Sequence, residues 1–199
     1  AFAPDGRLFV WQKNGIVRVI KQGVLLTTPF IDLSAKVNTF DDRGLWGLAF
    51  HPSFASNGYV YLSYVYESGG NPNDPSPKTS RLTRVTANPS HLDVALAGSE
   101  VVILGTIGKA PCSKQGAGAD CIPADGGSHT LGSLHFAADG KLFVGNGDGS
   151  DGDVLSLRAQ DINSYSGKIL RINDNGTAPS DNPFYDGTNS IRSKVWLYG

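Results

Sequence analysis

The chain repeats one pattern three times: an aromatic residue, a short segment with Asp-Gly or Asn-Gly, and a run rich in β-branched and aromatic residues. The copies are FAPDGRLFV at residues 2–10, FHPSFASNGYVYLSYV at 50–65 and FAADGKLFVGNGDG at 136–149. Asp-Gly and Asn-Gly favour two-residue hairpin turns, because both central residues of such turns need positive φ. Each copy therefore predicts strand, tight turn, strand, and the unit is a meander of antiparallel strands.

The spacing of the turns predicts the architecture. Asp5, Asn57 and Asp139 lie 52 and 82 residues apart, and the longer interval contains two segments that we expect to be insertions, at about 68–79 and 105–127. Without them the period approaches the roughly 40 to 50 residues of a four-stranded propeller blade. A sheet covered on both faces needs apolar side chains on both, whereas a β-sandwich more often has one polar face. The prediction is an all-β fold, a β-propeller of four-stranded antiparallel blades without long helices.

About three blades fit into the 199 residues. A propeller has typically four to eight blades and closes into a ring. We therefore expect residues 1–199 to be part of one larger domain, completed by blades from the same or another chain.

Charge and hydropathy exclude two classes of partner. The chain has 17 Lys and Arg against 18 Asp and Glu, so it lacks the basic surplus of a nucleic-acid-binding protein. No run approaches the roughly 18 apolar residues of a membrane span, and residues 1–10 lack the order of a signal peptide. If the protein is exported, its signal has already been removed.

Three residues suggest two covalent modifications that are typical of exported proteins. Cys112 and Cys121 are nine positions apart, and we predict a disulfide between them. Two free thiols or half of a metal site are the alternatives, but no further ligand has the spacing of a zinc site. A disulfide indicates a secreted or periplasmic location. Asn175 begins an N-glycosylation sequon, which matters only if the source glycosylates secreted proteins.

The strongest candidate for chemistry is a histidine–aspartate pair. His129 precedes the strand predicted before the Asp139-Gly140 turn, and Asp148 follows the strand predicted after it. Pairing of the two strands about that turn brings both residues to the same end of the hairpin. A carboxylate bonded to imidazole fixes its tautomer and raises its basicity, as a general base requires. An exposed loop histidine beside a turn aspartate is the simpler interpretation.

Two other acidic segments are weaker candidates. In GNGDGSDGD at 145–153, the position where an EF-hand needs glycine is Asp151 and the position where it needs glutamate is Leu157, which excludes an EF-hand but not a looser calcium site. In DDRGLWGL at 41–48, Asp42 and Arg43 stand at the start of an expected inner strand. They either face the central channel or form a self-paired surface turn.

Taken together, the segments RGLWGLAFHPSFASNGYVYLSYV, HTLGSLHFAADGKLFVGNGDG, SGKILRINDNGTAPSDNPF and VWLYG resemble the glucose/sorbosone dehydrogenase family. That family includes six-bladed propellers that carry pyrroloquinoline quinone (PQQ) and calcium. The resemblance places the general base on His129 and its aspartate partner on Asp148, and tentatively puts cofactor contacts at Asp42 and Arg43.

The chain also departs from the family pattern. A glutamine that contacts the cofactor in quinoprotein members is replaced by Asp42 followed by Arg43, and an aspartate that often precedes the catalytic histidine is Ser128. The family's arginine clamp and most of its calcium ligands fall after VWLYG. Some relatives, such as the hedgehog-interacting proteins, use the propeller only for binding.

Two hypotheses follow. The resemblance implies an exported PQQ-dependent aldose dehydrogenase, which needs a sugar substrate and an external electron acceptor. The alternative is a binding or structural propeller without catalysis, presenting its loops to glycans or to another protein.

Overall fold

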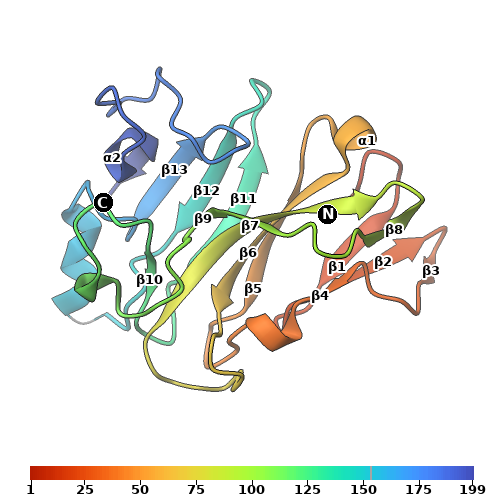
Figure 1. Cartoon of the computed structure of the whole chain (residues 1–199), viewed down its shortest axis with the longest axis horizontal. Coiled ribbons are helices and arrows are strands. Elements are labelled where there is room, and N and C mark those ends of the chain that lie inside the picture. The colour runs from red at the N-terminus through yellow and green to blue at the C-terminus, as the bar shows by residue number, and fades with distance from the viewer. Residues whose placement is uncertain (153) are drawn as a thin grey trace.

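The computed structural model describes residues 1–152 and 154–199, which form three antiparallel sheets standing side by side (Figure 1). Each sheet begins near one copy of the repeated sequence pattern. The sheets are the blades of a β-propeller, so the all-β prediction with about three blades is confirmed.

The first sheet is built on β2. Its strands are β1 (Leu8–Trp11), β2 (Ile16–Lys21), β3 (Val24–Leu25) and β4 (Ile31–Asp32). β2 pairs with β1 and with both short strands, and every pairing is antiparallel.

The second sheet has six strands, two more than predicted for a blade. β5 (Leu45–Phe50), β6 (Tyr59–Tyr66) and β7 (Lys78–Asn88) form a meander. The long β7 also pairs with β8 (His91–Ala95), β9 (Val101–Leu104) and β10 (Ile122–Ala124). The eleven residues of β7 offer an edge that three short strands share.

The third sheet keeps chain order. Its strands are β11 (Leu131–Phe136), β12 (Leu142–Asn146), β13 (Lys168–Ile172) and β14 (Val195–Tyr198). The helical segments of the described chain are short, and none is longer than seven residues. They are α1 (Phe54–Asn57), α2 (Ile191–Lys194) and the 3-10 turns η1 (Ser34–Lys36), η2 (Cys112–Lys114) and η3 (Val154–Gln160).

The blades are held together by two hydrophobic cores, one on each face of the second sheet. The first joins that sheet to the first blade and contains Phe9 and Leu62, while the second joins it to the third blade and contains Tyr61 and Val144. All four side chains are fully buried. Burying a side chain of this size stabilises the fold by about 1.5–3 kcal/mol, so blade contact is a main source of stability.

The turns differ from the prediction. At the third copy Gly140 has a φ of +76°, but Asp139 keeps a negative φ. The Gly140 N–H donates to the Ala137 carbonyl at 3.0 Å, and the Ala137 N–H donates to the Lys141 carbonyl at 2.9 Å, so the hairpin loop is longer than two residues. The Asp139 carboxylate accepts from the Lys141 N–H at 3.0 Å. Aspartate thus acts through its side chain, and only the glycine needs a left-handed backbone.

Candidate functional site

The site lies where the two inner strands β5 and β11 begin. The Asp42 N–H, just before β5, donates to the Gly127 carbonyl, just before β11, at 3.0 Å. Ser63 of the second blade donates to the Gly132 carbonyl of β11 at 2.5 Å. The loops at 41–44 and 125–130 therefore share one end of the propeller and are bonded to each other.

His129 is exposed and backbone-strained. Its side chain is 57% exposed, and its Nδ1 lies 3.3 Å from Oδ1 of Asp148. Its φ of +54° is a left-handed conformation that a residue with a side chain seldom adopts. The His129 carbonyl accepts from the Gly149 N–H at 2.8 Å. The pairing of β11 with β12, which joins Leu131 to Asn146, brings these loops together as expected.

Asp148 is anchored more firmly than its partner. Its side chain is 18% exposed, and its Oδ1 also accepts from the Ser150 N–H at 3.0 Å. The Asp148 carbonyl accepts from Nε and Nη2 of Arg158 at 3.2 and 3.0 Å. A fixed carboxylate beside Nδ1 leaves Nε2 of an exposed imidazole open, and an arrangement of this kind can accept a proton from a bound hydroxyl.

Gly149 connects the two loops. Its carbonyl accepts from the N–H groups of Asp125 and Gly126 at 2.8 and 2.9 Å, and from Nη2 of Arg158 at 3.2 Å. The φ of Gly149 is +69°, and a Cβ there would lie 2.4 Å from the Pro123 carbonyl oxygen. Only glycine fits this position, so the glycine-rich sequence after β12 is a packing requirement of the site.

Asp42 is exposed, whereas the next residue, Arg43, is buried. Its side chain is fully buried, and its guanidinium donates to the carbonyls of Gly126 at 3.0 Å and of Asp125 at 3.3 Å. It also donates to the carbonyls of Asp74 and Ser76 at 3.1 and 2.9 Å. Burial lowers the pKa of the Arg43 guanidinium. Arg43 thus joins the 68–79 segment to the loop before His129, and cofactor contact by Asp42 and Arg43 stays a prediction.

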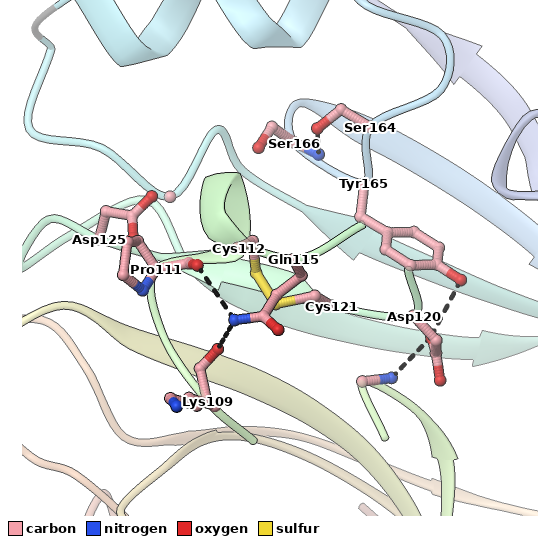
Figure 2. Close-up of a disulfide and its surroundings, with 12 residues drawn as sticks. Lys109, Pro111, Cys112, Gln115, Asp120, Cys121, Asp125, Ser164, Tyr165 and Ser166 are labelled. Atoms are coloured by element: carbon pink, nitrogen blue, oxygen red, sulfur yellow. Dashed lines mark hydrogen bonds between the residues drawn. A yellow bond between two sulfur atoms is a disulfide. The ribbon is translucent and has the colours of Figure 1, made fainter. Parts of the chain in front are cut away.

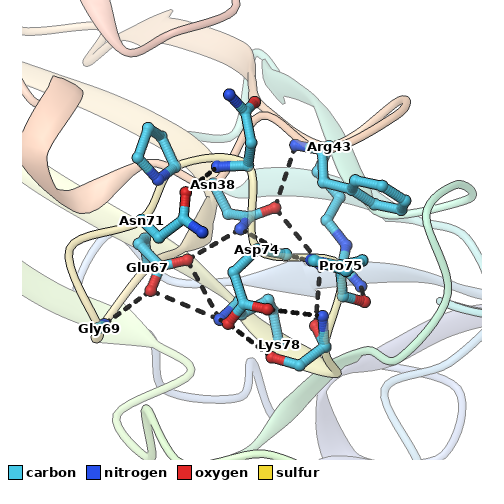
Figure 3. Close-up of polar contacts among 12 residues, drawn as sticks. Asn38, Arg43, Glu67, Gly69, Asn71, Asp74, Pro75 and Lys78 are labelled. Atoms are coloured by element: carbon cyan, nitrogen blue, oxygen red, sulfur yellow. Dashed lines mark hydrogen bonds and ion pairs between the residues drawn. The ribbon is translucent and has the colours of Figure 1, made fainter.

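The 68–79 segment is held by a buried polar network (Figure 3). Glu67 is 3% exposed and accepts from Asn38 at 2.8 Å and from the Gly69 N–H at 2.6 Å. Lys78 lies 3.1 Å from Glu67 and 2.5 Å from Asp74. Burial favours the neutral form of Glu67, but these donors together lower its pKa. The network explains how a segment rich in turn-forming residues holds Arg43 in place.

Ser128, the departure next to His129, is bonded to Asp151. The Ser128 N–H and Oγ donate to Oδ1 of Asp151 at 3.1 and 3.2 Å. Bonds from the backbone N–H groups of Gly127 and Ser128 lower the pKa of Asp151. A carboxylate therefore supports the loop from across the site.

The calcium hypothesis for 145–153 gains no support from the structure. Asp153 lies outside the described residues. Among residues 1–152 and 154–199, no three His, Cys, Asp or Glu side chains are grouped so that they could hold a metal ion.

The predicted disulfide is confirmed (Figure 2). Cys112 and Cys121 are bonded, with Cα atoms 5.6 Å apart. The loop is also held by Asp120, which accepts from the Gly105 N–H at 3.0 Å and from the Tyr165 hydroxyl at 3.1 Å. Asn175 lies exposed in the loop after β13, and its Oδ1 accepts from the Thr177 hydroxyl at 2.7 Å. Glycosylation of Asn175 stays a prediction. The described part of the chain has no helix long and apolar enough to cross a membrane.

Sequence reasoning missed Arg158, Asp125 and Gly149. Arg158 donates to backbone carbonyls and to the Asp125 carboxylate, and backbone acceptors leave no signature in the sequence. The run of glycines after β12 was the one available signal, and it marks the close approach of the loops.

Known proteins resemble this chain over all or most of its length. Quinoprotein glucose dehydrogenase B of Acinetobacter calcoaceticus is 27% identical over 216 residues, covering 100% of this chain and 40% of that protein. Hedgehog-interacting protein of mouse is 27% identical, covering 92% of this chain and 26% of that protein. The chain thus spans less than half of the length of either relative.

A solved structure supports the fold. PQQ-bound aldose sugar dehydrogenase of Streptomyces coelicolor matches with a TM-score of 0.71 at 23% identity, over 99% of this chain and 48% of that one. Three blades in about half of such a chain agree with an expected six. The family model described as Glucose / Sorbosone dehydrogenase matches residues 1–199. Because that match covers the entire chain, this protein belongs to the glucose/sorbosone dehydrogenase family.

Proposed function

We propose that this chain is part of an exported PQQ-dependent aldose dehydrogenase in which His129 is the general base. The observation that carries the proposal is the pair itself: an exposed imidazole whose Nδ1 lies 3.3 Å from a well-anchored carboxylate. The quinoprotein relative supports the choice of reaction. The disulfide supports export, because disulfides persist in oxidising compartments.

The described residues fit PQQ in part. His129 offers an open nitrogen for a substrate hydroxyl, as a quinone-dependent oxidation of an alcohol requires. The quinone also carries carboxylates that need cations. Arg43 and Arg158, which hold the loops of the site, are already bonded to backbone carbonyls, and Arg158 is also paired with Asp125. We therefore assign His129 and Asp148 to proton transfer and expect the cations, with most calcium ligands, outside residues 1–199.

In this proposal Nε2 of His129 accepts the proton of the sugar's C1 hydroxyl. Asp148 holds the ring so that Nδ1 faces the carboxylate, and it stabilises the imidazolium that forms. PQQ, when bound with calcium, supplies the acceptor for the hydride from C1. The aldose loses a hydride and a proton and becomes a lactone, and an external acceptor removes the electrons afterwards.

The test is reconstitution of the full-length protein with PQQ and calcium, followed by dye reduction with a panel of aldoses. We expect sugar-dependent reduction that requires both additions. Absence of reduction with every aldose, in protein shown to be folded, would contradict the proposal.

A second candidate function is a non-catalytic binding propeller. Arg43 favours it, because at the position where quinoprotein relatives carry a cofactor-contacting glutamine this chain continues into a buried arginine that supports loops. The similarity to hedgehog-interacting protein favours it as well. Binding of a glycan or a protein without turnover in the reconstitution assay would select this function.

A further inference from the structure

Arg158 contacts the backbone of Asp148 and Gly149, and the carboxylate with which it forms an ion pair is that of Asp125. Arg158 belongs to η3, between β12 and β13, and its side chain is 18% exposed. We propose that Arg158 is a positioning residue that sets the distance between His129 and Asp148. The inference rests on the proposed function, since it matters only if this pair moves a proton.

The guanidinium of Arg158 binds the backbone of Asp148 and Gly149, in the loop after β12. Nε and Nη2 donate to the Asp148 carbonyl at 3.2 and 3.0 Å, and Nη2 also donates to the Gly149 carbonyl at 3.2 Å. These bonds hold the backbone of Asp148 in place, and Arg158 therefore fixes the position of the Asp148 carboxylate as well. The Gly149 N–H in turn donates to the His129 carbonyl at 2.8 Å, which connects Arg158 to the other half of the pair.

Asp125 orients Arg158. Nη1 of Arg158 lies 2.5 Å from Oδ2 of Asp125, whose side chain is 7% exposed. A charge-assisted bond at a site of low exposure is stronger than one in water. The N–H of Asp125 also donates to the Gly149 carbonyl. Arg158, Asp125 and Gly149 are therefore bonded to one another in one cluster.

The geometry leaves little tolerance. At 3.3 Å, the contact between His129 Nδ1 and Asp148 is already longer than a usual N–H···O bond of about 2.9 Å. A small outward shift of the Asp148 backbone would break it. The Gly149 bond holds the left-handed backbone of His129, so a loosened Gly149 would free the histidine too.

The test compares variants of the full-length protein, reconstituted with PQQ and calcium. We expect Arg158→Met to lower kcat by about 10²-fold with little change in KM, because misplacement by about 1 Å costs that much when sugar binding is intact. Arg158→Lys should recover only part of the rate, since lysine lacks the fork that binds both carbonyls. Arg171→Met is the control. Like Arg158, Arg171 is ion-paired with a carboxylate, here Asp139 and Asp181, and it is buried at the opposite end of the third sheet.

Two readouts separate positioning from general loss of structure. In an Asp148→Asn background, Arg158→Met should have almost no further effect on kcat, because both changes disable the same contact. In protein without cofactor, the ¹⁵N signals of the His129 imidazole should show the Nδ1–H tautomer, and Arg158→Met should shift them toward a mixture, while Arg171→Met should not. If Arg158→Met does not fold, Asp125→Asn gives the same comparison.

The outcomes are distinguishable. Retained turnover in His129→Ala would overturn the proposed function. Loss of turnover in His129→Ala, together with normal kcat and an unchanged tautomer signature in Arg158→Met, would overturn the positioning role alone. A full additional loss of rate in the Asp148→Asn background would also overturn it.

Discussion

His129 combines exposure, backbone strain and a carboxylate partner within one residue. We expect His129→Ala to lower kcat of the reconstituted protein by about 10²- to 10⁴-fold, which is the usual contribution of a general base. The fold should persist, because the side chain is 57% exposed. Steady-state kinetics with an unchanged circular dichroism spectrum checks this expectation, and His135→Ala on β11 is the matched control.

Because Lys168 is buried and its pKa is lowered, we expect the stability of the protein to depend on pH. The Nζ of Lys168 is buried and donates to the Ala159 and Ser166 carbonyls, and burial lowers the pKa of Lys168 to about 8. An unfolded lysine titrates near 10.4, so between these values the unfolded state binds more protons and stability rises with pH. We expect the free energy of unfolding to be higher at pH 9.5 than at pH 8 by on the order of 1 kcal/mol.

The check is urea unfolding of the wild type and Lys168→Met across this range. The variant should have a smaller slope, which is not zero because burial also lowers the pKa of Lys194, whereas an equal slope in both proteins would refute the assignment. Burial raises the pKa of Tyr61 to about 12, so tyrosine ionisation opposes the trend only at higher pH.

The sequence predicted that His129 and Asp148 lie close together, but it did not predict the residues that hold their loops in place. Counting residues from the Asp139-Gly140 turn was enough to bring His129 and Asp148 together, because antiparallel register follows from the hairpin. Arg158 and Arg43 were not identified as supports, because their acceptors are mostly carbonyl oxygens that every residue has.

Arg43 connects two loops beside the candidate site, because it binds carbonyls in the 68–79 segment and in the loop before His129. We expect Arg43→Met to destabilise the protein by about 3 kcal/mol or more, because it leaves several buried carbonyls without donors. Exposed Arg192→Met should change stability by less than about 0.5 kcal/mol. Urea unfolding measures both, and equal effects of the two variants would show that the network around 68–79 does not need its arginine.

The disulfide gives a second prediction about an element. Replacing both cysteines, Cys112→Ser with Cys121→Ser, should lower stability by about 2–3 kcal/mol, the range for closing so short a loop. The blades should remain folded because Asp120 still binds Gly105 and Tyr165. Thermal unfolding with circular dichroism at low temperature tests both parts, and an unfolded double variant would contradict the second.

The strands were more predictable than their connections. Residues 59–66 carry apolar side chains on both faces, and the structure buries both faces of β6. The three short strands on β7 were not anticipated, because each of β8, β9 and β10 has only two or three paired residues in the ladder and no sustained alternation. The segment expected as an insertion at 105–127 therefore supplies β10 to the sheet.

For the whole molecule, the outer part of the third blade determines behaviour in solution. Ile169, Trp196, Leu197 and Tyr198 are 39–58% exposed. Contiguous apolar surface drives association, and an unpaired strand edge recruits other chains. We expect residues 1–199, expressed alone, to sediment as oligomers or aggregates, and Leu197→Lys to reduce this association. A monomer with a cooperative thermal transition would contradict the expectation.

The bond between Asp42 and Gly127 has a consequence for how activity is lost on heating. It joins the second blade to the loop that carries His129 on the third, so the site spans a seam between two sheets. A slight parting of those sheets would pull the loop while each sheet stays folded. We therefore expect inactivation to begin several degrees below the melting of the β-structure, with recovery on cooling as the seam closes.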